Sequence, residues 1–155
     1  YENVYGINNP YIPLYKNIYI TLKSELNFSN KAKTSVYYID QKGKYDYLGG
    51  NWKGNKIKFK TRHLGKFVLL ADTIAPITKV IIKNSQEIKV KIDDDLSGIK
   101  SFIATINDKW LLMNYDSKNK MLWSEKLDEK VPLEGEFKIT VIDKIGNKKI
   151  FVTKF

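Results

Sequence analysis

Short runs in which apolar and polar residues alternate strictly are the feature that most restricts how this chain can fold. The clearest run lies at residues 56–61, where Ile57 and Phe59 alternate with lysines. Alternate residues of a strand point to opposite faces, so Ile57 and Phe59 are predicted to point inward and the lysines outward. Residues 18–23 and 88–92 show the same alternation. Each run is predicted to be a β-strand with one buried and one exposed face.

The remaining sequence also favours strands over helices. Ten tyrosines, seven phenylalanines and three tryptophans are present, and aromatic and β-branched residues favour strands. Long runs with apolar residues at helical spacing are missing, so we predict an all-β protein. Further strands are predicted at residues 34–39, 45–48, 66–71, 80–82, 99–106, 110–115, 121–123, 136–142 and 149–155. Residues 99–106 and 110–115 are predicted to form a hairpin across Asn107-Asp108-Lys109, because Asn and Asp tolerate positive φ. Residues 1–14, which contain two prolines, are predicted to be an extended or looped entry.

Residues 72–76, Asp-Thr-Ile-Ala-Pro, separate two series of predicted strands. Pro76 lacks an amide hydrogen and favours extended geometry at Ala75, so this segment suits a taut connector. We predict two tandem immunoglobulin-like β-sandwich modules, residues 1–72 and 73–155. The second has about seven strands at a spacing of about ten residues, which is typical of this fold. The first has about five, so it is small and could be truncated upstream of Tyr1.

The net charge of +10 is concentrated in the first predicted module. Residues 1–72 carry 12 basic and 5 acidic residues, a net of +7, whereas residues 73–155 carry 15 and 12, a net of +3. Such a charge attracts anionic polymers, whether nucleic acid, acidic cell-wall glycan or an anionic membrane surface. Solvated strand faces would also explain the lysines. Arg62 is the single arginine, and phosphate recognition usually enlists arginine, so nucleic acid is not an expected partner.

Acidic and amide side chains near the ends of predicted strands form a candidate calcium site. Its proposed ligands are Asp72, Asp93, Asp95, Asp143 and Asn147. In a sandwich, the turn after one strand can lie beside the turn between the last two strands, and oxygen ligands suit calcium. The alternative is a solvated loop, because neighbouring carboxylates in water repel by only about 1 kcal/mol per pair at ~4 Å. No other cofactor is predicted for this chain.

Aromatic residues near glycine-rich turns offer a candidate binding platform. Tyr45, Tyr47 and Trp52 lie in such a region, and their flat faces could stack on sugar rings or bases. Trp110 and Trp123 could stack in the same way. Both lie in hydrophobic runs, however, where burial is the commoner outcome, so we predict that both are core residues. Trp52 is therefore the first aromatic residue to test for binding.

The residues that common catalytic sites require are missing from this sequence. The chain has no cysteine, and its single histidine, His63, lies beside Arg62 just before a turn, where we predict a surface position. A catalytic zinc site would need further histidine or cysteine ligands, and no Gly-x-Ser-x-Gly elbow is present. We predict that this chain is not an enzyme. The lack of cysteine leaves its compartment open, and no apolar run approaches the roughly 20 residues that span a bilayer.

Several short motifs together carry a resemblance to a known family. They lie at residues 64–67, 72–76, 94–101, 104–107 and 110–113. Over residues from about 10 to 155, the chain resembles the C-terminal, non-catalytic β-sandwich region of lysostaphin-type zinc metallopeptidases. These are exported bacterial endopeptidases that cut peptidoglycan cross-links. Residues 143–147 also resemble the Asp-x-x-Gly-Asn turn of bacterial immunoglobulin-like domains.

The resemblance implies a function of binding rather than catalysis. The chain would position or target a peptidoglycan endopeptidase in the cell envelope, in the periplasm or at the cell surface. The family's zinc ligands lie in His-x-x-x-Asp and His-x-His elements, whereas Phe67 lies four positions after His63 and no second histidine exists. The zinc and the peptidase domain would therefore lie upstream of Tyr1. Expected partners are this upstream domain and peptidoglycan or another anionic envelope polymer.

A second class of function is a structural or adhesion module of a bacterial surface protein. In such a protein, calcium or packing would stiffen a row of sandwiches. An upstream domain with the two histidine motifs would favour the first class, and an array of further sandwiches would favour the second.

Overall fold

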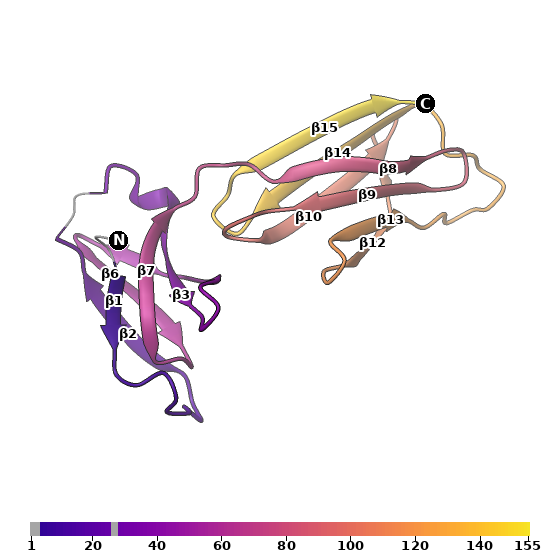
Figure 1. Ribbon diagram of the computed structural model, residues 1–155. Coiled ribbons are helices and arrows are strands. Elements are labelled where there is room, and N and C mark those ends of the chain that lie inside the picture. Colours follow the sequence, from indigo (N-terminus) through magenta and orange to yellow (C-terminus); the bar gives the residue numbers. More distant parts are fainter. Residues whose placement is uncertain (1–3, 26–27) are drawn as a thin grey trace. The chain divides into compact units, whose positions relative to one another are not determined.

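The computed structural model describes residues 4–25 and 28–155 (Figure 1). Strands dominate these residues, and the one helix described is a short 3-10 turn, η1 (Lys31–Lys33). All strand pairs are antiparallel and form sandwich-like sheets, so the prediction of an all-β fold is confirmed. The chain divides into two compact units, Tyr1–Thr73 and Ile74–Phe155. Within the described residues, no helix is long and apolar enough to cross a membrane.

The first unit contains two antiparallel sheets. One has the strand order β1-β7-β3-β4 and the other the order β2-β6-β5. The strands are β1 (Val4–Ile7), β2 (Ile18–Lys23), β3 (Thr34–Ile39), β4 (Tyr45–Gly49), β5 (Asn51–Lys53), β6 (Lys56–Thr61) and β7 (Gly65–Ala71).

An apolar core joins the two sheets of the first unit. Ile57 and Phe59 of β6 are buried, as the alternation predicts, and they share one hydrophobic cluster with Phe67 and Leu69 of β7. The ring centroids of Phe59 and Phe67 lie 5.3 Å apart. Burial of each large apolar side chain contributes roughly 1.5–3 kcal/mol. Packing in this core keeps one face of β6 buried and leaves its other face exposed to solvent.

Two strands of the first unit lie where the sequence did not predict strands. β1 falls within residues 1–14, of which residues 1–3 lie outside the described residues, and it pairs with β7. Tyr5 and Ile7 of β1 pack against the core, so tertiary pairing outweighs the local signals of the nearby prolines. β5 follows two glycines, and Gly50 has φ +134; an added Cβ would lie 2.7 Å from the Ile57 side chain. Glycine is required for this close approach.

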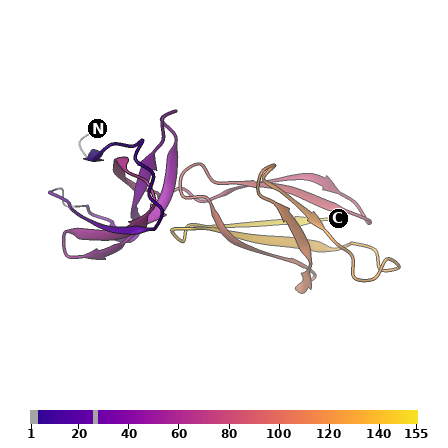
Figure 2. The same ribbon diagram turned by 90° about the horizontal axis from the view of Figure 1, so that it is seen from below.

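The second unit also contains two antiparallel sheets, with the orders β11-β10-β14-β15 and β12-β13-β9-β8. Figure 2 shows the two layers, with the yellow β15 in one and the pink β8 in the other. The strands are β8 (Ile77–Lys83), β9 (Ile88–Asp93), β10 (Ile99–Ile106), β11 (Lys109–Leu111), β12 (Met113–Asp116), β13 (Met121–Ser124), β14 (Glu136–Asp143) and β15 (Lys148–Lys154). The core between them includes Val90, Leu122 and Ile139, each with no exposed surface.

The predicted strand at residues 110–115 is interrupted at Leu112. Residues before it belong to β11 in one sheet, and residues after it belong to β12 in the other. Leu111 and Met113 are both buried in the same core cluster. Burial of both explains why the chain crosses between the sheets here.

The hairpin predicted between β10 and β11 is confirmed. Asn107 and Asp108 have φ values of 46° and 60°, which suit a two-residue turn between antiparallel strands. The turn sets the register, which places Trp110 opposite Thr105. Because Leu111 points into the core, its neighbour Trp110 points to the outer face of the sheet.

Candidate functional site

The outer face of the sheet β2-β6-β5 carries five exposed lysines. They follow from the same alternation that buries Ile57 and Phe59, because every second residue of these strands faces solvent. We call these residues the lysine array: Lys23, Lys53, Lys56, Lys58 and Lys60. The outward orientation of the β6 lysines is the one that the sequence predicted.

Register brings three of these lysines side by side. Lys56 lies opposite Lys23 of β2 and also opposite Lys53 of β5. Neighbouring strands are about 4.7–4.9 Å apart, and residues two apart in a strand are separated by about 6.5–7 Å. The backbone positions of the lysine array are therefore spaced regularly, both along β6 and across the three strands.

Neutral and aromatic residues complete this face. Tyr19 lies opposite Lys60, Thr21 lies opposite Lys58, and Asn51 lies opposite Lys58 on the other side. The Lys58 ammonium lies 4.8 Å from the centre of the Tyr19 ring, which is 67% exposed. None of the paired outward positions is acidic. Like charges directly opposite each other destabilise a sheet, so this face has an unfavourable repulsion that a bound polyanion would relieve.

The structure places Trp52 at the edge of the core of the first unit. Its indole N–H donates a 2.8 Å hydrogen bond to the carbonyl oxygen of Thr34, and its ring packs 5.8 Å from that of Phe28. The Lys31 ammonium lies 5.7 Å from the indole centre. Trp52 is half-buried, so only part of its surface is open to a ligand.

Tyr45 and Tyr47 both lie in β4 and extend from the same face of that strand. Tyr45 is exposed, and Tyr47 is half-buried with its ring edge-on to Tyr37 at 5.5 Å. Trp52 belongs to β5, in the other sheet of the first unit. A binding role for these three aromatic residues stays a prediction.

Two of the predicted calcium ligands lie in or beside the acidic loop after β9. Asp93 forms a 2.6 Å ion pair with Lys120, and this hydrogen bond raises the pKa of Lys120 above its usual range. Asp95 is exposed. A cation at Asp93 would have to compete with the Lys120 ammonium.

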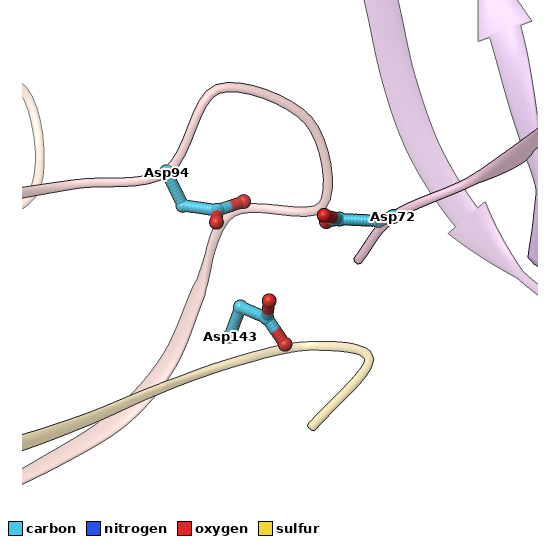
Figure 3. Close-up of side chains that lie close together, drawn as sticks. All are labelled: Asp72, Asp94 and Asp143. Carbon is cyan, nitrogen blue, oxygen red and sulfur yellow. The ribbon is translucent and has the colours of Figure 1, made fainter. Parts of the chain in front are cut away.

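Asp143 and Asn147 form a closed turn within the second unit. Both oxygens of the buried Asp143 carboxylate accept hydrogen bonds, from the amides of Ile145 and Asn147 and from Nδ2 of Asn147, at 2.7–3.0 Å. Asp94 belongs to the acidic loop of residues 93–95 but is not among the predicted ligands. Its carboxylate lies near that of Asp143 (Figure 3), with one oxygen of each within 4.8 Å. Asp72, also drawn in Figure 3, belongs to the first unit, where its amide donates to the carbonyl of Lys33. Calcium binding stays a prediction.

His63 and Arg62 have structural contacts. His63 is exposed, and its ring stacks on Tyr38 with the centroids 4.7 Å apart. The Arg62 guanidinium donates 3.3–3.4 Å hydrogen bonds to the carbonyl oxygens of Leu14 and Tyr15. The single arginine therefore fastens a loop, and the charge of the exposed β2-β6-β5 face comes from lysine alone.

The prediction that Trp110 and Trp123 are core residues is wrong. Trp110 is 58% exposed and Trp123 is 37% exposed. Their flanking apolar residues, Leu111 and Leu122, are the buried ones. Because the side-chain period is two, burial of one residue in a strand turns its neighbours outward.

Comparisons with known proteins give one family match. Residues 1–72 match the family model described as a Zu5-like domain. The match covers less than half of the chain and ends one residue before the first compact unit ends. The first unit is therefore similar to Zu5-like domains. No curated protein matches the chain significantly.

Among solved structures, one similar chain is the apo expansin of Clavibacter michiganensis, known from a crystal structure. The sequence identity is 12%, and the alignment covers 88% of this chain and 76% of that chain, with a TM-score of 0.43. A TM-score this low does not establish a shared fold.

Proposed function

We propose that the chain is a non-catalytic β-sandwich region that positions or targets an exported peptidoglycan endopeptidase in the bacterial cell envelope. The lysine array is the observation that carries this proposal. Five exposed lysines on one face of a sheet, without an acidic neighbour among the paired positions, suit an extended anionic polymer of the envelope. The enzyme to be positioned is suggested only by the resemblance of short sequence motifs to those of lysostaphin-type metallopeptidases.

The physical basis is sequence-independent electrostatic attraction. A polyanion that contacts several lysines releases its condensed counterions, so its affinity falls steeply as salt rises. Lysine suits this role because its ammonium is a mobile point charge on a flexible stem. A set of such groups can follow a polymer without requiring one fixed geometry.

The proposal is tested by pelleting the protein with purified bacterial sacculi that retain their anionic polymers. The informative variant replaces Lys56, Lys58 and Lys60 with glutamine. Retention at low salt is expected for the unchanged protein, with a loss in this variant and in high salt. A matched control replaces Lys42, Lys44 and Lys66, which lie in the first unit outside the array, and so removes the same charge.

Two results would contradict this proposal. If sacculi do not retain the unchanged protein at low salt, the proposed targeting function is wrong. An equal loss in both triple variants would mean that net charge, rather than the lysine array, determines binding.

The second class of function, a structural or adhesion module of a surface protein, is supported by the acidic side chains of the second unit. Asp94 and Asp143 approach each other there, and a cation would strengthen that end of the sandwich. Reading the full-length gene separates the two classes. An upstream domain with the His-x-x-x-Asp and His-x-His motifs supports the first, and an array of sandwiches supports the second.

A further inference from the structure

Trp110 is the most exposed of the three tryptophans, and it lines two neighbouring hollows of the second unit. One hollow, of about 210 Å³, extends toward Leu127, and the other, of about 290 Å³, extends toward Pro132. Trp110, Leu111, Val131 and Leu133 line both. Trp110 thus borders both hollows, together with these three apolar residues.

The wall opposite Trp110 is held in place by backbone hydrogen bonds. The segment after β13 begins with the amide of Glu125 bound to the carbonyl of Leu112, and later the amide of Leu133 binds the carbonyl of Ser85. Nδ2 of Asn107 donates to the carbonyl oxygen of Glu134. The segment is fastened at both ends, so the hollows are formed before any ligand arrives, which lowers the entropic cost of binding.

The rim of the hollows is rich in hydrogen-bond acceptors. Glu125, Asp128 and Glu134 contribute carboxylates, and one Glu125 oxygen accepts from Nδ2 of Asn114. The Lys126 ammonium is already engaged by the carbonyl of Glu129 and by Gln86. Lys109 also lines one hollow, so the rim has three carboxylates and two lysines and lacks the uniform positive charge of the lysine array.

We infer that the Trp110 hollows bind an uncharged glycan whose sugars carry N-acetyl groups. A sugar ring has an apolar C–H face that stacks on an indole, and hydroxyl edges that donate to carboxylates. The exposed side chains of Leu127 and Val131 provide an apolar contact for an acetyl methyl group. Each hollow is smaller than the roughly 300–1,000 Å³ of a drug-sized site, which suits a single sugar substituent.

A protein partner fits this surface less well. A stable protein interface buries about 800 Å² on each partner, whereas the exposed large apolar side chains that line the hollows are Trp110, Leu127 and Val131. Ile103, Ile150 and Val152 are also exposed, but they lie on the outer face of the sheet and do not line the hollows. Carboxylates at the rim would also remain unpaired against an apolar partner. The inference stands on the second unit and does not depend on the lysine array.

The test is a titration of the ¹⁵N-labelled full chain with N,N′,N″-triacetylchitotriose, observed through the tryptophan indole N–H signals. The Trp110 signal is expected to shift with saturation in the millimolar range, and the Trp123 signal is expected to stay in place. Trp110→Ala should weaken binding on the order of tenfold or more, and Trp110→Phe should retain part of it. Trp123→Ala, which removes another exposed indole of the same unit, is the matched control and should bind normally.

Cellotriose, which lacks the acetyl groups, should bind more weakly than the acetylated trisaccharide. Absence of any shift, equal binding of both sugars or an equal loss in both alanine variants would overturn the inference. Analytical ultracentrifugation provides a further test. If the unchanged protein is a dimer and Trp110→Ala is a monomer, a second copy of the chain occupies the hollows and the inference is wrong. Retention on sacculi by the lysine array can persist or fail independently of all these results.

Discussion

Lys56 of β6 lies directly opposite Lys23 of β2, and both side chains extend from the exposed face of the same sheet. Two cations at adjacent strand positions repel each other, and the pairing of Lys56 with Lys53 on the other side adds a second repulsion. The sandwich therefore tolerates an electrostatic cost at the face where we propose that a polyanion binds.

Lys56→Gln is expected to stabilise the free protein while weakening its attachment to polyanions. Removing the central charge relieves both repulsions, so the free energy of unfolding should rise by about 0.2–0.5 kcal/mol at low ionic strength. The gain should shrink in 1 M salt, where the Debye length falls to about 3 Å. Urea unfolding at two salt concentrations measures this. Lys42→Gln, in a turn, is the control, and a gain of equal size there would contradict the explanation.

Substitutions of Trp52 are expected to distinguish its contribution to stability from a contribution to ligand binding. Trp52→Phe keeps a ring against Phe28 but loses the hydrogen bond to Thr34, which should cost about 1 kcal/mol. Trp52→Ala should cost about 3 kcal/mol, because it also removes the ring from the edge of the core. Chemical denaturation measures both values. If Trp52→Ala still folds and binds sacculi unchanged, the hypothesis of an aromatic platform at Trp52 is wrong.

Asp143→Ala is expected to destabilise the second unit by about 3 kcal/mol, because three hydrogen-bond donors of a buried turn lose their acceptor. Asp116 provides a matched control, since it accepts similar bonds from the amides of Lys118 and Asn119 and from Nδ2 of Asn119. The Asp116 turn is exposed, so water can replace the lost acceptor. Equal losses in the two alanine variants, measured by urea unfolding, would contradict this account.

Asp108 is expected to make stability depend on pH in the acidic range. The hydrogen bond and charge of Lys138 lower the pKa of Asp108 below its usual value of 3.8. The stabilisation is therefore present above the unfolded-state value and is lost as the pH falls through the folded-state value. Asp108→Asn should be less stable than the unchanged protein at pH 6, and the difference should vanish near pH 2. Urea unfolding across this range measures it, and a difference that persists at pH 2 would refute the ion-pair origin.

Calcium is expected to raise the melting temperature if the acidic loop binds it, and a chelator should reverse the rise. Calorimetric titration should show heat, and Asp95→Asn should reduce it because the exposed carboxylate of Asp95 is a predicted ligand. Magnesium at the same concentration controls for general screening, since it demands tighter octahedral geometry. Absence of both heat and a melting shift would reject the calcium prediction.

Much of the strand structure could be predicted from local pattern. Ile57 and Phe59 alternate with lysine so regularly that their inward position follows from the side-chain period alone. The positive φ values of Asn107 and Asp108 likewise confirm a turn expected from residue type. Local chemistry was insufficient at β1, where pairing with β7 creates a strand beside prolines.

The candidate sites, like the strands, could be predicted only in part from local sequence. The sequence alone determined that the β6 lysines face solvent, because alternation is a property of one strand. Only the tertiary structure decided that Lys23 and Lys53 join them, because cross-strand register depends on how three separate segments pair. It also decided that Trp110 is exposed beside two hollows while Trp52 is tied to Thr34. The sequence of an apolar run does not determine which of its residues are buried. The burial of an aromatic residue there depends on whether it or its neighbour in the strand faces the core.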